Sequence, residues 1–139
     1  MPVGPLHSWS RREILPALPS PQAVVGLIAL APSTAFREGT TPGETNVPGV
    51  YTHYDSGNTD GSQVPRCILQ YECSTDAGGL IVHGPAATND WYAQGERTTS
   101  AYFGGAFRTS ELTGFDANAF TALGARLVSG DLVDGIIAF

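Results

Sequence analysis

The stretch QAVVGLIALAP, residues 22–32, is the longest apolar segment of the chain and decides its fold class. The apolar run extends from Ala23 to Ala31 and ends at Pro32. A short run of this kind, rich in β-branched residues and bounded by proline, is typical of a buried β-strand, which we expect over residues 22–31. Because a helix needs about 20 apolar residues to cross a bilayer, we expect a soluble protein that does not enter a membrane.

The residues before this strand form a proline-rich arm. Residues 1–21 contain Pro2, Pro5, Pro16, Pro19 and Pro21, so neither a helix nor a central strand is expected there. The same prolines break the helix that a secretory leader requires. The arm has five large apolar side chains, Val3, Leu6, Trp9, Ile14 and Leu15. Since leaving them in water is unfavourable, we expect a partner to receive the arm; packing of the arm on its own domain is the alternative.

The residues after Pro32 predict several more short strands and one helix. Asp116 is placed to cap a helix over residues 116–128, in which Phe120, Leu123 and Leu127 share one face and which Gly130 ends. The segments with strand patterns are 50–54, 64–73, 79–83, 100–103, 106–108 and 132–139. Strands and helices do not alternate, so the sequence predicts an α+β fold: a small, mainly-β domain over residues 22–139.

The composition limits the classes of partner. The chain has 139 residues, 14% of them charged, and a net charge of -6. It contains no lysine, which excludes Schiff-base chemistry on a side-chain amine. An acidic chain lacks the clustered positive charge that binds phosphate backbones, so no nucleic acid is expected as a partner. A surface poor in charge favours a place within an assembly, although a biased genome composition would give the same numbers.

The candidate metal ligands do not form a recognisable site. Cys67 and Cys73 are too few for a structural zinc site. On one continuous strand they would lie about 20 Å apart, too far for a disulfide, so we expect two small buried side chains. The turn Ser56–Gly61 resembles a calcium loop, but Cys67 stands where the bidentate glutamate is needed. A turn held by its own Asp and Asn side chains is expected instead, with no metal and no cofactor.

The candidate catalytic groups are two histidines. His53 lies near Asp55, and His83 could be combined with Ser74 and Asp76 as a hydrolase triad. No nucleophile elbow, phosphate-binding loop or dinucleotide fingerprint accompanies them, so we expect no enzyme and no catalytic residues. A set of aromatic residues could form a sugar-binding platform, although aromatic residues at strand spacing more often pack across strands. These residues are Tyr51, Tyr54, Trp91, Tyr92, Tyr102 and Phe103.

The order of features beyond Val50 resembles a known family. An aromatic and Asp-Gly-rich turn, Tyr54–Gly61, is followed by a strand through Ile68 and Leu69. The segments Leu80–Asn89 and Gly105–Leu112, the helix from Asp116 and the final Gly135-Ile-Ile complete the pattern. This arrangement, over residues 47–139, is similar to the lambda-type head decoration proteins of tailed bacteriophages. The matching positions relate to fold alone: Asp55, Gly57, Asp60, Gly61, Gly105, Phe107 and Leu112.

The resemblance implies a capsid decoration (cement) protein. Members of that family stand as homotrimers on the outer capsid surface of the virion, and their N-terminal segments engage the major capsid protein. By that likeness the arm of residues 1–21, with Val3, Leu6, Trp9, Ile14 and Leu15, would be the capsid-binding segment. The long leader before the turn departs from the family pattern, so the placement of the arm is the weakest part of the likeness. A small β ligand-binding or adhesion module is the alternative function.

Overall fold

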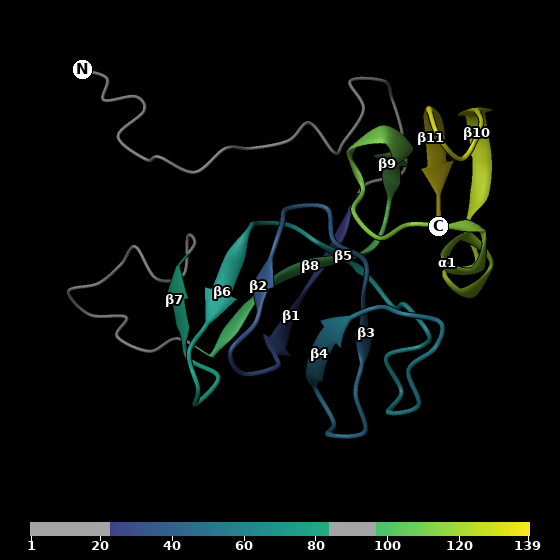
Figure 1. Cartoon of the computed structure of the whole chain (residues 1–139). Helices are drawn as coiled ribbons and strands as arrows, with labels where there is room; N and C mark the ends of the chain where they lie inside the picture. Colours follow the sequence, from purple (N-terminus) through teal and green to yellow (C-terminus); the bar gives the residue numbers. More distant parts are fainter. Residues whose placement is uncertain (1–22, 84–96) are drawn as a thin grey trace, which may run out of the picture.

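The structure is a computed structural model that describes residues 23–83 and 97–139. In this part of the chain the fold is mainly β with one short α-helix, as the sequence predicts (Figure 1). The strands and helices are β1 (Val24–Leu30), β2 (Ala35–Phe36), β3 (Pro42–Glu44), β4 (Val50–His53), β5 (Ile68–Leu69), β6 (Cys73–Thr75), β7 (Ile81–His83), β8 (Thr98–Gly104), β9 (Ala106–Arg108), the 3₁₀-helix η1 (Thr109–Glu111), α1 (Ala117–Ala122), β10 (Arg126–Gly130) and β11 (Gly135–Ala138).

The strands form three sheets. The largest has the order β3-β4-β1-β8-β5, and its only parallel pair is β1 with β4. The other two are antiparallel and three-stranded, in the orders β2-β6-β7 and β10-β11-β9. In Figure 1 these two smaller sheets lie toward opposite sides of the molecule, with the five-stranded sheet between them.

Each smaller sheet packs on the large sheet through its own core. The first core joins the large sheet to β2, β6 and β7 and is made of buried side chains, namely Ile28, Leu30, Phe36, Tyr51, Cys67, Leu69, Cys73, Ile81 and Ala101. The second joins β5 and β8 to the C-terminal sheet through Ile68, Tyr102, Phe107 and Ile137. Since side chains alternate along a strand, Leu69 and Ile68 enter different cores, and so do Ala101 and Tyr102. The large sheet is therefore covered by different elements on its two faces.

The helix begins where the sequence predicts and ends six residues early. The Asp116 carboxylate accepts a hydrogen bond from the Ala119 amide at 2.8 Å, which confirms the cap. The predicted end at residue 128 is wrong, because Gly124 adopts a left-handed φ of 70° directly after the last turn. The amides of Gly124 and Ala125 bond back to the carbonyls of Thr121 and Phe120, as in a Schellman motif. Leu127 consequently belongs to β10, and Gly130 closes a turn between strands instead of ending a helix.

Two predicted strands are shorter than expected. The segment 64–73 is not one strand: β5 pairs with β8 in the large sheet, whereas β6 pairs with β2 and β7 in another. The last strand begins at Gly135 instead of residue 132, because the Asp131 carboxylate accepts hydrogen bonds from the amides of Val133 and Asp134 and forms a turn. The chain bends at both places where the apolar pattern alone predicts continuation.

The strand predicted over residues 22–31 is confirmed as β1, but the expectation that it is buried is only half right. Ile28 and Leu30 are 2% exposed in the first core. On the other hand Val24, Val25 and Leu27 are 59%, 52% and 70% exposed. The central strand of the large sheet therefore has one buried face and one face open to solvent.

Candidate functional site

The open face of β1 is the first candidate for an interaction surface. Val25 pairs with Tyr102 and Leu27 with Ser100, so these four side chains project to the same face of the sheet. The C-terminal sheet packs on Tyr102 and buries it, whereas it does not reach Leu27, which stays exposed. On the other side Ala29 pairs with Val50 of β4, and both are partly buried. We name Val24, Val25 and Leu27 the β1 patch.

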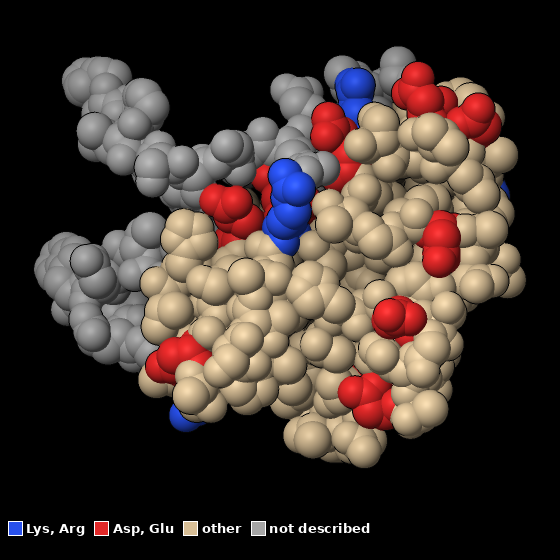
Figure 2. Space-filling model, in the orientation of Figure 1, with Lys and Arg blue, Asp and Glu red and all other residues tan. Residues whose placement is uncertain are grey.

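The two central strands of the large sheet, β1 and β8, carry no charged side chain. Neither contains Asp, Glu, Arg or His. Elsewhere the described surface has carboxylates scattered over it, with fewer arginines, as the face drawn in Figure 2 shows. A surface of aliphatic side chains without charge at its centre is typical of the core of a protein–protein interface.

Other exposed apolar side chains lie at sheet edges and turns. Val82 on β7 is 58% exposed and is followed by His83. Leu127 and Val128 on β10, with Val133 in the following turn, are 45%, 53% and 80% exposed. These residues are interspersed with Arg126, Asp131 and Asp134. A bulge at Val128 interrupts the ladder of β10 with β11, and such bulges oppose pairing of an edge with another chain.

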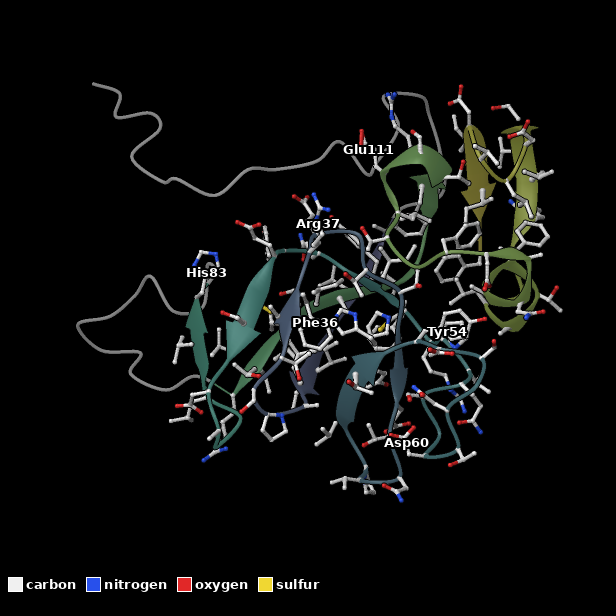
Figure 3. All side chains as sticks on the ribbon, in the orientation of Figure 1. Phe36, Arg37, Tyr54, Asp60, His83 and Glu111 are labelled. Carbon is white, nitrogen blue, oxygen red and sulfur yellow. The ribbon has the colours of Figure 1, made fainter. Side chains whose placement is uncertain are left out.

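The Asp-Gly-rich turn is held by its own side chains. The Asp60 carboxylate accepts hydrogen bonds from the hydroxyl and the amide of Ser62, and these two bonds lower the pKa of Asp60. The Asp55 carboxylate accepts one from the Gly57 amide at 2.8 Å. Gly61 has a φ of 106°, and a Cβ there would lie 2.5 Å from the Glu44 carbonyl oxygen. The turn predicted from residues 55–61 is confirmed, with its carboxylates bonded to the loop itself (Figure 3).

The two described histidines belong to local structure. The His53 ring stacks on Phe36 with centroids 4.4 Å apart, and its Nε2 lies 2.9 Å from the Ala35 carbonyl oxygen. His83 lies opposite Ser74 in the β6–β7 ladder, so the structure brings that predicted pair together. Its Nε2, however, is 3.5 Å from the Glu72 carboxylate, and its side chain is exposed (Figure 3). The Asp76 carboxylate accepts hydrogen bonds from the amides of Gly78 and Leu80, which places it in a turn.

Both cysteines are free and buried, as predicted. They lie in the first core, where Cys67 is 0% and Cys73 1% exposed. Burial, together with the nearby charges of Glu44 and Glu72, raises the pKa of each thiol to about 12. A thiol with so high a pKa holds almost no thiolate at neutral pH and is a poor nucleophile or metal ligand.

The aromatic residues do not form one platform. Tyr51 and Tyr102 are buried in the two cores, which confirms the packing interpretation for them. The Tyr54 hydroxyl donates to the Asp116 carboxylate at 3.0 Å and so links the turn to α1. Phe103 is 36% exposed and its ring covers Gly26. Trp91 and Tyr92 lie outside the described residues.

A small hollow lies over the C-terminal sheet. It measures about 240 Å³ and is lined by side chains and backbone that include Arg108, Ser110, Ser129 and Asp134. The Arg108 Nε atom is buried without a hydrogen-bond partner. The lining contains both the positive charge of Arg108 and the negative charge of Asp134, so it does not favour binding of an anion.

The predicted arm residues, Val3, Leu6, Trp9, Ile14 and Leu15, lie outside the described residues. The open face of β1, which begins directly after the arm, was not predicted as a site. Its signal in the sequence is an apolar run on both faces of one strand, which requires a cover on each side. That pattern does not encode whether the residues that cover each face belong to the same chain.

Residues 23–83 and 97–139 contain neither a metal-binding cluster nor a membrane-spanning helix. No cluster of three or more His, Cys, Asp or Glu side chains there is arranged to hold a metal ion. No helix within those ranges has the length and apolar character needed to cross a membrane. Comparison of the chain with protein families, with characterised proteins and with solved structures gave no match.

Proposed function

We propose that this chain is a capsid decoration protein of a tailed bacteriophage, which binds the assembled head as a trimer and stabilises it. The proposal begins from the order of features over residues 47–139 and from the proline-rich arm. The observation that favours it most is the β1 patch, an uncharged aliphatic face on the central strand, directly after the arm. Exposed aliphatic surface of this kind serves protein contacts better than chemistry on a polar substrate.

A protein of this type acts by binding and needs no reaction. If it binds only the expanded shell, it stabilises that state by mass action, because every bound copy must be released before the shell can come apart. The described histidines and carboxylates that were candidates for catalysis serve turns, ring stacking and a surface contact between His83 and Glu72. This use of the polar side chains is consistent with a structural role.

The test is binding to empty shells assembled from the major capsid protein of the phage that encodes this chain. Purified protein is mixed with unexpanded and with expanded shells, and each mixture is sedimented. We expect the chain to sediment with expanded shells only and to raise their melting temperature. If it sediments with neither form, the proposed function is wrong. Glycan-array binding in the same preparation would favour the adhesion module instead.

A further inference from the structure

We propose that the β1 patch is the surface through which three copies of this chain associate. The inference rests on the proposed function, in which the protein is a trimer, and it assigns that contact to Val24, Val25 and Leu27. These side chains lie on the central strand of the largest sheet and are all more than half exposed. An exposed aliphatic row on a central strand is unusual, because sheets normally cover such a row.

The charge distribution favours a second copy of the chain as the occupant. Each copy has a net charge of -6, so close approach of two copies is opposed unless the contact avoids charged residues. The fourteen residues of β1 and β8, shared between the two faces of the sheet, include no Asp, Glu, Arg or His. The patch around Leu127 and Val128, in contrast, contains Arg126 and is followed by two aspartates.

The position of the arm gives a second argument for this surface. The 22 residues outside the described structure at the N-terminus end at Gln22, two residues before Val24. Three copies that meet through β1 would therefore start their arms close together, beside the symmetry axis. Arms that leave from one place reach one set of capsid sites together, which is the geometry that multivalent binding requires.

Leu27 is the most exposed residue of the β1 patch, with 70% of its surface accessible. Its cross-strand partner Ser100 and its neighbour along the strand, Ala29, are both small, so Leu27 is left accessible to another molecule. An exposed aliphatic surface of this kind suits contact with another protein surface. Closed symmetry lets the same patch be used in every copy, which prevents open-ended growth.

The experiment compares charge substitutions at matched exposed positions. Val25→Asp and Leu27→Asp place a carboxylate in the β1 patch, whereas Val82→Asp places one on β7, where the valine is exposed to a similar degree: 58% against 52% for Val25. Light scattering at micromolar concentration measures the mass. We expect three chains for the wild type and for Val82→Asp, and a single chain for both β1 variants. Circular dichroism and a cooperative melt verify that each variant is folded.

A labelling experiment keeps the proposal testable if the charged variants fail to fold. Leu27→Cys and Val82→Cys are treated with a maleimide, and the native cysteines give little background because they are buried and their pKa is raised to about 12. We expect slow labelling at position 27 and fast labelling at position 82 in the assembled protein.

Three results would overturn the proposal. A wild type with the mass of one chain at every concentration removes the self-association. A Leu27→Asp variant that keeps the mass of three chains places the contact elsewhere. Protection of Leu27→Cys in a protein with the mass of one chain shows that the arm of the same chain covers the patch. Sedimentation with expanded shells is measured in parallel, so failure of the trimer contact and failure of the decoration function are separate outcomes.

Discussion

Asp60 stabilises its turn through one carboxylate oxygen that accepts two hydrogen bonds from Ser62. Asp60→Ala removes that acceptor, and we expect a melting temperature lower by a few degrees, as for other lost local bonds. Asp60→Asn keeps an acceptor oxygen and should lose less. Added calcium and added chelator should leave all three melting temperatures unchanged. A steep rise of the wild-type melting temperature with calcium would show that the loop holds the metal.

The same residue predicts a pH dependence. The hydrogen bonds from Ser62 hold the pKa of Asp60 in the folded protein below its usual value of 3.8. A carboxyl group with a lowered folded pKa contributes stability above its unfolded pKa and loses it as the pH falls through the folded value. The difference in melting temperature between the wild type and Asp60→Ala should therefore be full at neutral pH and shrink below about pH 4. A difference that stays constant down to acid unfolding would contradict this assignment.

Cys67 and Cys73 predict a simple test of the first core. Burial raises the pKa of both thiols to about 12, so a disulfide reagent at mild pH should react with neither in the folded protein. In denaturant both should react. One thiol reacting at the rate of a free cysteine in the native protein would show that the first core opens, and hydrogen exchange on β6 would then locate the opening.

At the scale of elements, Gly124 decides where the helix ends. Its φ is 70°, and a Cβ at this position would have nothing within 4 Å, so Gly124→Ala adds backbone strain without a clash. We expect it to lower the free energy of unfolding by about 1 kcal/mol, measured by urea denaturation. Gly78→Ala is the matched control: its φ is not left-handed, its nearest contact is at 3.5 Å, and it should change little. No effect of Gly124→Ala would favour the longer helix.

The sequence predicted the first long strand, the start of the helix and the Asp-Gly-rich turn, but it missed β2, β3 and β10 and the end of the helix. The apolar run before Pro32, the cap at Asp116 and the Asp-Gly-rich turn each depend on neighbouring residues, and all three are confirmed. The helix end was missed because Phe120, Leu123 and Leu127 keep helical spacing across a glycine that changes the chain direction. The spacing of apolar residues shows which side chains can share a helix face. The end of the helix, in contrast, depends on the backbone conformation of Gly124 alone.

The break between β5 and β6 has a different cause. Alternation through Cys67, Leu69 and Tyr71 is what one strand would show, and it persists because both halves contribute buried side chains to the first core. Three residues between them are enough to transfer the chain from the large sheet to β2 and β7. Pairing partners lie far apart in the sequence, so the sheet to which a short strand belongs cannot be read from its own residues.

At the scale of the whole molecule, the two proposed interaction surfaces, the arm and the β1 patch, differ in what the sequence shows. The arm was predicted from its prolines and apolar side chains, whereas the β1 patch required knowledge of which face the smaller sheets cover. A strand with apolar side chains on both faces is expected to be packed against other residues on both sides. The sequence does not show whether those residues belong to the same chain. The sheet of β2, β6 and β7 covers one face of β1, whereas Leu27 on the other face is exposed.

The last prediction concerns the arm, residues 1–21. Ordering an extended arm costs conformational entropy, which offsets much of the free energy gained by burying Trp9, Ile14 and Leu15, so one arm alone should bind weakly. Three arms on one trimer bind at the high effective concentration set by the shared body, and each added contact can strengthen binding by about 10²- to 10⁴-fold.

Deleting residues 1–21 should therefore leave a protein that melts normally and keeps the mass of three chains, because the proposed trimer contact begins at Val24. The same deletion should abolish sedimentation with expanded shells, and Trp9→Ala should weaken it. Leu27→Asp gives the complementary result, a single folded chain whose one arm binds shells weakly. If the truncated protein decorates shells as tightly as the full chain, the arm is not the anchor, and packing of the arm on its own domain is the better explanation.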